Sequence, residues 1–264
     1  MTKDGAVFIL DKSIEYLLYL LIFFVPISIS AIEILFISSM IIFVAKKILK
    51  PDFEFFKDYT HFFLIAFFVF CALSLFNSGM YLGKSLRAIF TKWLEYLIFF
   101  IMVGDTINTP RRVRNAIFIL IASSALIGLD AVFQKVQGID FLLRRDLIVG
   151  RMTAAFKTPN SLAAYLVPIL LLAITLLFSK YITKRHKHFL FILIIILSIV
   201  LISTFARGGW LGFIAGLSLL LFLLRNIKKA SIPLLVFLAI LLATPALRER
   251  MIASGDDQRK SVFG

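Results

Sequence analysis

The chain has 264 residues, of which 61% are hydrophobic, and its mean hydropathy is +0.98. This composition excludes an ordinary soluble globular protein, because apolar runs of about 20 residues recur and each is long enough to cross a bilayer. The formal net charge of +14 would indicate nucleic-acid binding in a soluble protein. Here, loop charges that orient the spans and attract anionic lipids explain it better. We therefore expect membrane lipids as partners and no nucleic acid.

Hydropathy predicts an all-α fold, a polytopic membrane bundle of about nine transmembrane helices. We expect no cleavable signal peptide, because the first apolar run lacks a small-residue cleavage site. Pro26 marks either a short turn between the first two spans or a kink within one. The expected spans are residues 14–27, 30–45, 60–77, 85–103, 113–132, 159–178, 189–203, 208–224 and 230–244.

Basic residues in alternate connections orient these spans. With a cytoplasmic N-terminus, every short inner loop is basic, as the positive-inside rule requires. The three histidines, His61, His186 and His188, also fall at predicted cytoplasmic positions. The inner basic residues are Lys46, Lys47, Lys50 and Lys57; Arg111, Arg112 and Arg114; Lys180, Lys184, Arg185 and Lys187; and Arg225, Lys228 and Lys229.

Two outer connections break this charge pattern. The outer loop 133–158 holds five basic and two acidic residues, and Arg207 lies at the junction of the seventh and eighth spans. An arginine between membrane spans is costly unless it faces a cavity or a bound anion. Its planar fork binds two phosphate oxygens at once, which a lysine does not. The two connections therefore predict an anion site on the outer side.

The segment before the sixth span carries further signals for this site. Thr158 could cap a helix that begins at Pro159, since proline suits the first helical position. The positive end of that helix would lie near Arg151 and Lys157 and would attract an anion. The alternative is an ordinary capped helix whose basic side chains extend to the membrane surface.

Glycines after Arg207 indicate close approach of the backbone to another group. Gly208 and Gly209 allow a tight turn or a nearby ligand. Glycines at 208, 209, 212 and 216 predict a face on which helices pack closely.

A polar stripe also opens the fourth span. Lys84, Arg87, Thr91 and Glu95 share one face of an ideal helix. This face is either a hydrated groove or an internal ion pair that joins helices.

The sequence lacks the motifs of several enzyme classes. It contains no HExxH, no cysteine and histidine cluster, no Walker loop and no GxSxG. Metal, nucleotide and serine chemistry are therefore unsupported, and we expect no metal and no cofactor.

Two segments are similar to those of a known family. Arg151, followed by Phe-Lys-Thr-Pro-Asn-Ser-Leu-Ala-Ala-Tyr-Leu at 156–166, resembles the R…F-x-x-PN-x-LA-x-YL segment of the O-antigen ligase and polymerase family. Ser-Thr-Phe-Ala-Arg-Gly-Gly-Trp-Leu-Gly at 203–212 resembles the T-x-SRG-x-WLG signature of that family, with Ala206 where serine is common. The resemblance covers essentially the whole chain, but only the N-terminal two-thirds of a typical member.

The resemblance implies transfer of a glycan from undecaprenyl diphosphate to a hydroxyl acceptor, without metal, at the periplasmic face of the bacterial inner membrane. The acceptor is the lipid A core in ligases and another glycan repeat unit in polymerases. Arg151 and Arg207 would be the catalytic pair that holds the diphosphate. Lys157, Asn160 and Arg87 would be further substrate-binding residues.

The same resemblance sets the expected domains. Residues 1–244 would form the transmembrane domain, and 245–264 would begin a truncated periplasmic loop, before the histidine that serves as the family's proposed base. We therefore expect an incomplete glycosyltransferase. A lipid-linked glycan transporter is the alternative from another class, although it would place charges near the bilayer midplane and repeat its broken helices. A non-catalytic membrane protein is a third possibility.

Overall fold

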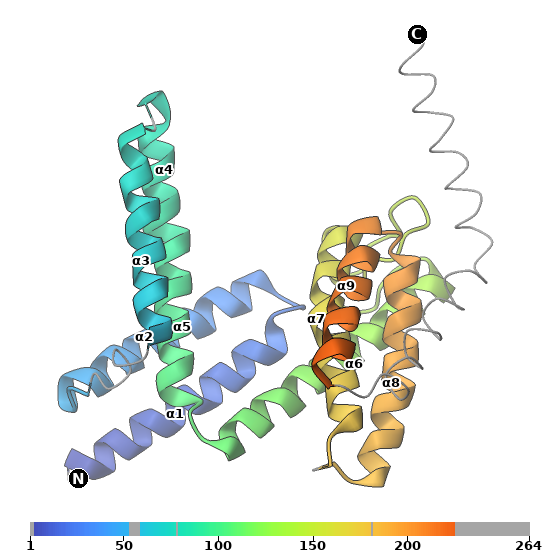
Figure 1. Cartoon of the computed structure of the whole chain (residues 1–264), viewed down its shortest axis with the longest axis horizontal. Helices are drawn as coiled ribbons and strands as arrows, with labels where there is room; N and C mark the ends of the chain where they lie inside the picture. The colour runs from blue at the N-terminus through green and yellow to red at the C-terminus, as the bar shows by residue number, and fades with distance from the viewer. Residues whose placement is uncertain (1–2, 53–58, 78, 181, 225–264) are drawn as a thin grey trace. The chain divides into compact units, whose positions relative to one another are not determined.

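The computed structural model describes residues 3–52, 59–77, 79–180 and 182–224. Throughout this part the secondary structure is helical, apart from two isolated β-bridges in the loop 138–158 (Figure 1). The chain divides within helix α6 (Pro110–Gln137) into two compact units, Met1–Leu120 and Ile121–Gly264. The predicted all-α class is confirmed for the described residues.

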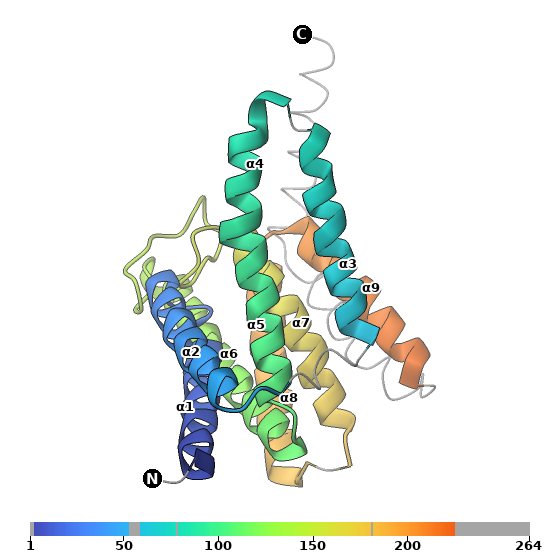
Figure 2. The same cartoon turned by 90° about the vertical axis from the view of Figure 1, so that its left-hand side faces the viewer.

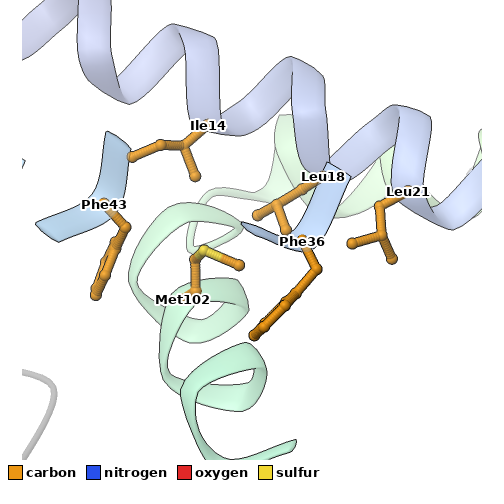
Figure 3. Packing of buried hydrophobic residues seen from close by; sticks show 6 residues of the cluster. All are labelled: Ile14, Leu18, Leu21, Phe36, Phe43 and Met102. Carbon is orange, nitrogen blue, oxygen red and sulfur yellow. The ribbon is translucent and has the colours of Figure 1, made fainter. Parts of the chain in front are cut away.

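The first unit begins with a helical hairpin of α1 (Lys3–Phe24) and α2 (Ile29–Leu49) (Figures 1 and 2). The chain turns at Pro26, so the proline marks a connection rather than a kink. Ser28 caps α2, because its hydroxyl accepts a hydrogen bond from the Ala31 amide at 3.3 Å. Apolar side chains on the facing sides of the hairpin enclose Met102 of α5 (Leu94–Thr106); Figure 3 shows them as Ile14, Leu18, Leu21, Phe36 and Phe43.

The expected fourth span is one unbroken helical stretch (Figure 2). It comprises α4 (Leu82–Ala88), a π-helical segment Ile89–Trp93, and α5. The neighbouring helix α3 (Tyr59–Leu73) packs on this stretch through Phe67, whose ring centroid lies 5.5 Å from that of Trp93. A π-turn inserts an extra residue, which shifts the helical register between Arg87 and Glu95. The prediction that the polar stripe shares one face assumes a regular α-helix. The structure has a π-helical segment at Ile89–Trp93 instead.

The second unit packs α7 (Pro159–Phe178) against α8 (Lys184–Ser203) and α9 (Arg207–Leu224) (Figure 1). Every fourth residue of one face of α7 is fully buried, which is the period of a helix stripe facing a core; these are Leu162, Leu166, Leu170 and Ile174. The helix α9 approaches α7 closely through Gly209 and Gly216. A Cβ atom at Gly209 would lie 2.8 Å from that of Ala163.

Four described helices are long and apolar enough to cross a membrane: Ile29–Leu49, Pro110–Gln137, Pro159–Phe178 and Lys184–Ser203. They support a membrane protein. Helices also lie over each of the first eight expected spans, but α1 carries Asp11, Lys12 and Glu15, and α3 has only 15 residues. The span 230–244 and the segment 245–264 lie outside the described residues. The count of about nine spans therefore stays a prediction.

Candidate functional site

A pocket of about 710 Å³ in the second unit brings together three of the five residues proposed from the sequence. These are Arg151, Asn160 and Arg207. Beside them, the wall is formed mostly by small or apolar residues of α7 and of the α8–α9 junction. The remaining lining residues are Ala164, Val167, Pro168, Phe205, Ala206, Gly208, Gly209 and Gly212.

The sharp junction between α8 and α9 places Arg207 at this pocket. The helix α8 ends at Ser203, and Phe205 adopts a left-handed conformation with φ of 51°. The Thr204 hydroxyl donates to the Leu201 carbonyl at 2.7 Å and accepts from the Ala206 amide at 3.2 Å. These bonds end one helix and start the next, so that Arg207 is the first residue of α9 and its side chain is exposed.

Arg151 reaches the same junction from the loop 138–158. Its Nε donates to the Thr204 carbonyl at 2.7 Å, and its Nη2 donates to Oδ1 of Asn160 at 3.2 Å. Arg151 closes a tight turn with Ile148, in which Val149 and Gly150 have φ values of 52° and 70°. The side chain thus joins the loop, the start of α7 and the end of α8.

The start of α7 follows the predicted cap. Thr158 is the N-cap residue and its Oγ1 accepts from the Ser161 amide at 3.1 Å, with Pro159 in the first turn. Both α7 and α9 therefore begin at the pocket, since Asn160 and Arg207 line it. Helix N-termini present amide groups and a positive dipole end. With two guanidinium groups, they make this pocket electrostatically suited to an anion such as a diphosphate.

The structure does not bring all five proposed residues together. Lys157 is exposed and is not among the lining residues of the pocket. Arg87 is exposed on α4 in the other unit, so its participation stays a prediction.

Sequence reasoning missed an ion network in the first unit. It assigned Lys46, Lys47 and Arg112 to membrane orientation alone. In the structure, Lys46 lies 2.6 Å from Asp11 and 2.9 Å from Asp105. The other pairs are Lys47–Asp105 at 2.6 Å, Arg112–Glu15 at 2.9 Å, Lys12–Glu15 at 2.7 Å and Arg112–Asp11.

This network borders a second pocket of about 410 Å³. Because Lys46, Lys47 and Arg112 already hold carboxylate partners, we interpret the network as structural. The signal that could have found it is the position of the two carboxylates: Asp105 precedes an expected basic inner loop, and Asp11 lies in the N-terminal segment expected on the same side.

Comparison with protein-family models, curated proteins and solved structures finds no match to this chain. The resemblance to the O-antigen ligase and polymerase family therefore stays a hypothesis based on its two motifs.

Proposed function

We propose that this chain carries the donor-binding part of a membrane glycosyltransferase of the O-antigen ligase type. Such an enzyme would take a glycan from undecaprenyl diphosphate and transfer it to a hydroxyl group of the lipid A core, at the periplasmic face of the bacterial inner membrane. The observation that carries this proposal is the pocket that Arg151, Asn160 and Arg207 share. These residues come from the two motifs that resemble the family.

The proposed topology has about nine spans and a cytoplasmic N-terminus. It puts the loop 133–158 and the α8–α9 junction on the periplasmic side, where the positive-inside rule does not call for basic residues. A bound anion explains why arginines stand there.

In the proposed reaction, the acceptor hydroxyl oxygen attacks the anomeric carbon and the bond from that carbon to the diphosphate breaks. The hydroxyl proton passes to a base, the role that the resemblance gives to the family's proposed histidine. Negative charge then builds on the leaving diphosphate. Fixed guanidinium groups and helix N-termini aimed at such charge stabilise the transition state. Arg151 and Arg207 would bind the diphosphate oxygens, and Asn160 would orient Arg151 through their hydrogen bond. The apolar wall of Ala164, Val167 and Pro168 would contact the lipid part of the donor.

Binding of undecaprenyl diphosphate to the purified chain in nanodiscs tests the proposal. Hydrogen bonds to charged groups contribute about 1.5–3 kcal/mol, so Arg207→Ala should weaken binding by about 10- to 100-fold. Arg207→Lys should recover part of the loss, because it restores the charge without the bidentate fork. Arg185→Ala, which removes an exposed arginine at the start of α8, is the matched control. Unaltered binding by Arg207→Ala would contradict the proposal.

The choice of acceptor distinguishes a ligase from a polymerase of the same family, because both would use the same donor. A ligase transfers labelled glycan to lipid A core, whereas a polymerase extends another lipid-linked repeat unit. The substitution equivalent to Arg207→Ala, made in a complete homologous protein, should abolish transfer while membrane insertion stays intact.

A further inference from the structure

A buried glutamine on α6 holds both arms of the loop that carries Arg151. The Gln134 side chain is fully buried. Its Nε2 donates to the Arg145 carbonyl at 3.2 Å, in the outgoing arm that leads away from α6. It also donates to the Thr153 hydroxyl at 2.9 Å, in the returning arm that leads to α7. Its Oε1 accepts from the amides of Thr153 and Ala154, both at 2.9 Å.

The returning arm is fixed on its other side by the α8–α9 junction. The Met152 amide donates to the Ser203 carbonyl at 3.2 Å, and the Arg151 Nε donates to the Thr204 carbonyl. Residues 151–154 therefore lie between Gln134 on α6 and the segment that leads into Arg207. A shift at Thr153 would displace the arginine two residues earlier.

We propose that Gln134 is a positioning residue: it fixes Arg151 beside the α8–α9 junction and thereby sets the affinity of the pocket for a diphosphate. The effect on affinity rests on the proposed function, whereas the placement of Arg151 does not. The role requires a side chain that both donates and accepts hydrogen bonds, as the Gln134 amide does with these partners. An apolar residue would leave two buried amides without their acceptor, which is costly.

Two variants separate this role from general stabilisation. Gln134→Leu removes every polar contact. Gln134→Glu keeps the acceptor and provides a donor only while its carboxyl is protonated. Burial among carbonyl groups favours the neutral acid, as do the nearby carboxylates. The charged residues around this position are Asp130 one turn earlier on α6, and Asp140, Arg145 and Asp146 in the loop.

The experiment combines amide hydrogen exchange of residues 151–156 with binding of farnesyl diphosphate to the full chain in nanodiscs. Gln134→Leu should speed exchange at Thr153 and Ala154 and weaken binding, each by about tenfold or more, as expected for a lost buried hydrogen-bond partner. Ser124→Ala, which removes a buried α6 hydroxyl that donates to the nearby Ile121 carbonyl, should change neither.

The pH profile gives a second readout. The affinity of Gln134→Glu, divided by that of the wild type at the same pH, should be highest near pH 5, where the protonated carboxyl still supplies one of the two donors. It should fall toward pH 8, because the buried carboxyl then ionises and loses its donor. The ratio for Gln134→Leu should be low throughout.

Unaltered exchange at residues 151–156 in Gln134→Leu would overturn the positioning role, whatever happens to binding. Faster exchange with wild-type affinity would overturn the link to the pocket. Failure of the wild-type chain to bind the probe would contradict the proposed function instead, and the exchange data would still decide whether Gln134 fixes Arg151.

Discussion

Asp11 lies between two cations, Lys46 and Arg112, in the ion network of the first unit. Burial by itself would raise the pKa of its carboxyl. The hydrogen bonds and positive charges of the two cations outweigh that effect and lower the pKa below its usual 3.8. A carboxyl whose pKa is lower in the folded than in the unfolded state stabilises the fold above the unfolded pKa. That contribution is lost as the pH falls through the folded value.

Asp11→Asn should therefore lower the thermal stability of the detergent-solubilised chain at pH 7, by about 1–3 kcal/mol for a partly buried ion pair. The difference between the variant and the wild type should begin to shrink below the unfolded pKa of about 3.9. It should vanish once the pH has fallen through the lower folded value, where the wild-type carboxyl becomes protonated. Scanning fluorimetry across this range measures it. Asp4→Asn, at an exposed position of the same helix, should have little effect, and an Asp11→Asn difference that persisted unchanged in acid would contradict the assignment.

The residues of the candidate site differ in how far the sequence predicts them. In the proposed topology, Arg151 and Arg207 lie on a side where the positive-inside rule does not explain basic residues. The two motifs single them out there, and the structure places both at one pocket. Gln134 has no such signal, because a neutral polar residue near the end of a span is common. Its importance follows only from the path of the loop around it, which depends on contacts distant in sequence.

At the scale of the elements, α7 and α9 approach closely where glycines remove the side chain. Gly209→Ala would put a methyl group 2.8 Å from the Ala163 Cβ, whereas a Cβ at Gly212 meets nothing within 4 Å. We expect Gly209→Ala to destabilise the second unit by about 1–3 kcal/mol through overpacking. Gly212→Ala should be neutral or stabilising by up to about 1 kcal/mol, because alanine favours the helix. Thermal unfolding of the two variants compares them directly, and equal stabilities would contradict the close packing.

The positions where helices begin and end follow local rules that can be read from the sequence. Which faces of the helices pack together cannot be read in the same way. Thr158 and Pro159 predict the start of α7 correctly, since a cap and a first-turn proline act within a few residues. The glycine face is correct only in part, because Gly209 and Gly216 meet α7 whereas Gly208 and Gly212 do not. The π-turn at Ile89–Trp93 has no simple sequence signature. Trp93, at its end, packs against Phe67 of α3, a contact distant in sequence that the local pattern does not reveal.

At the scale of the whole molecule, the number of spans decides on which side of the membrane the site lies. Crossings at only the four described helices that are long and apolar enough to span a membrane would return the loop 138–158 to the side of the N-terminus. With about nine spans, five crossings precede that loop and it lies on the opposite side. The topology with about nine spans puts Arg185 on the side of the N-terminus. The topology with four spans puts it on the other side of the membrane.

Cysteine labelling in intact cells distinguishes the two topologies. In a Cys71→Ser background, Leu143→Cys should react with a membrane-impermeant maleimide added from outside, after permeabilisation of the outer membrane alone. Arg185→Cys should react only once the inner membrane is opened. Both positions are exposed, so accessibility within the fold does not bias the result. The reverse pattern would place Arg151 and Arg207 in the cytoplasm, where the positive-inside rule alone explains their charge and the case for a periplasmic diphosphate site no longer holds.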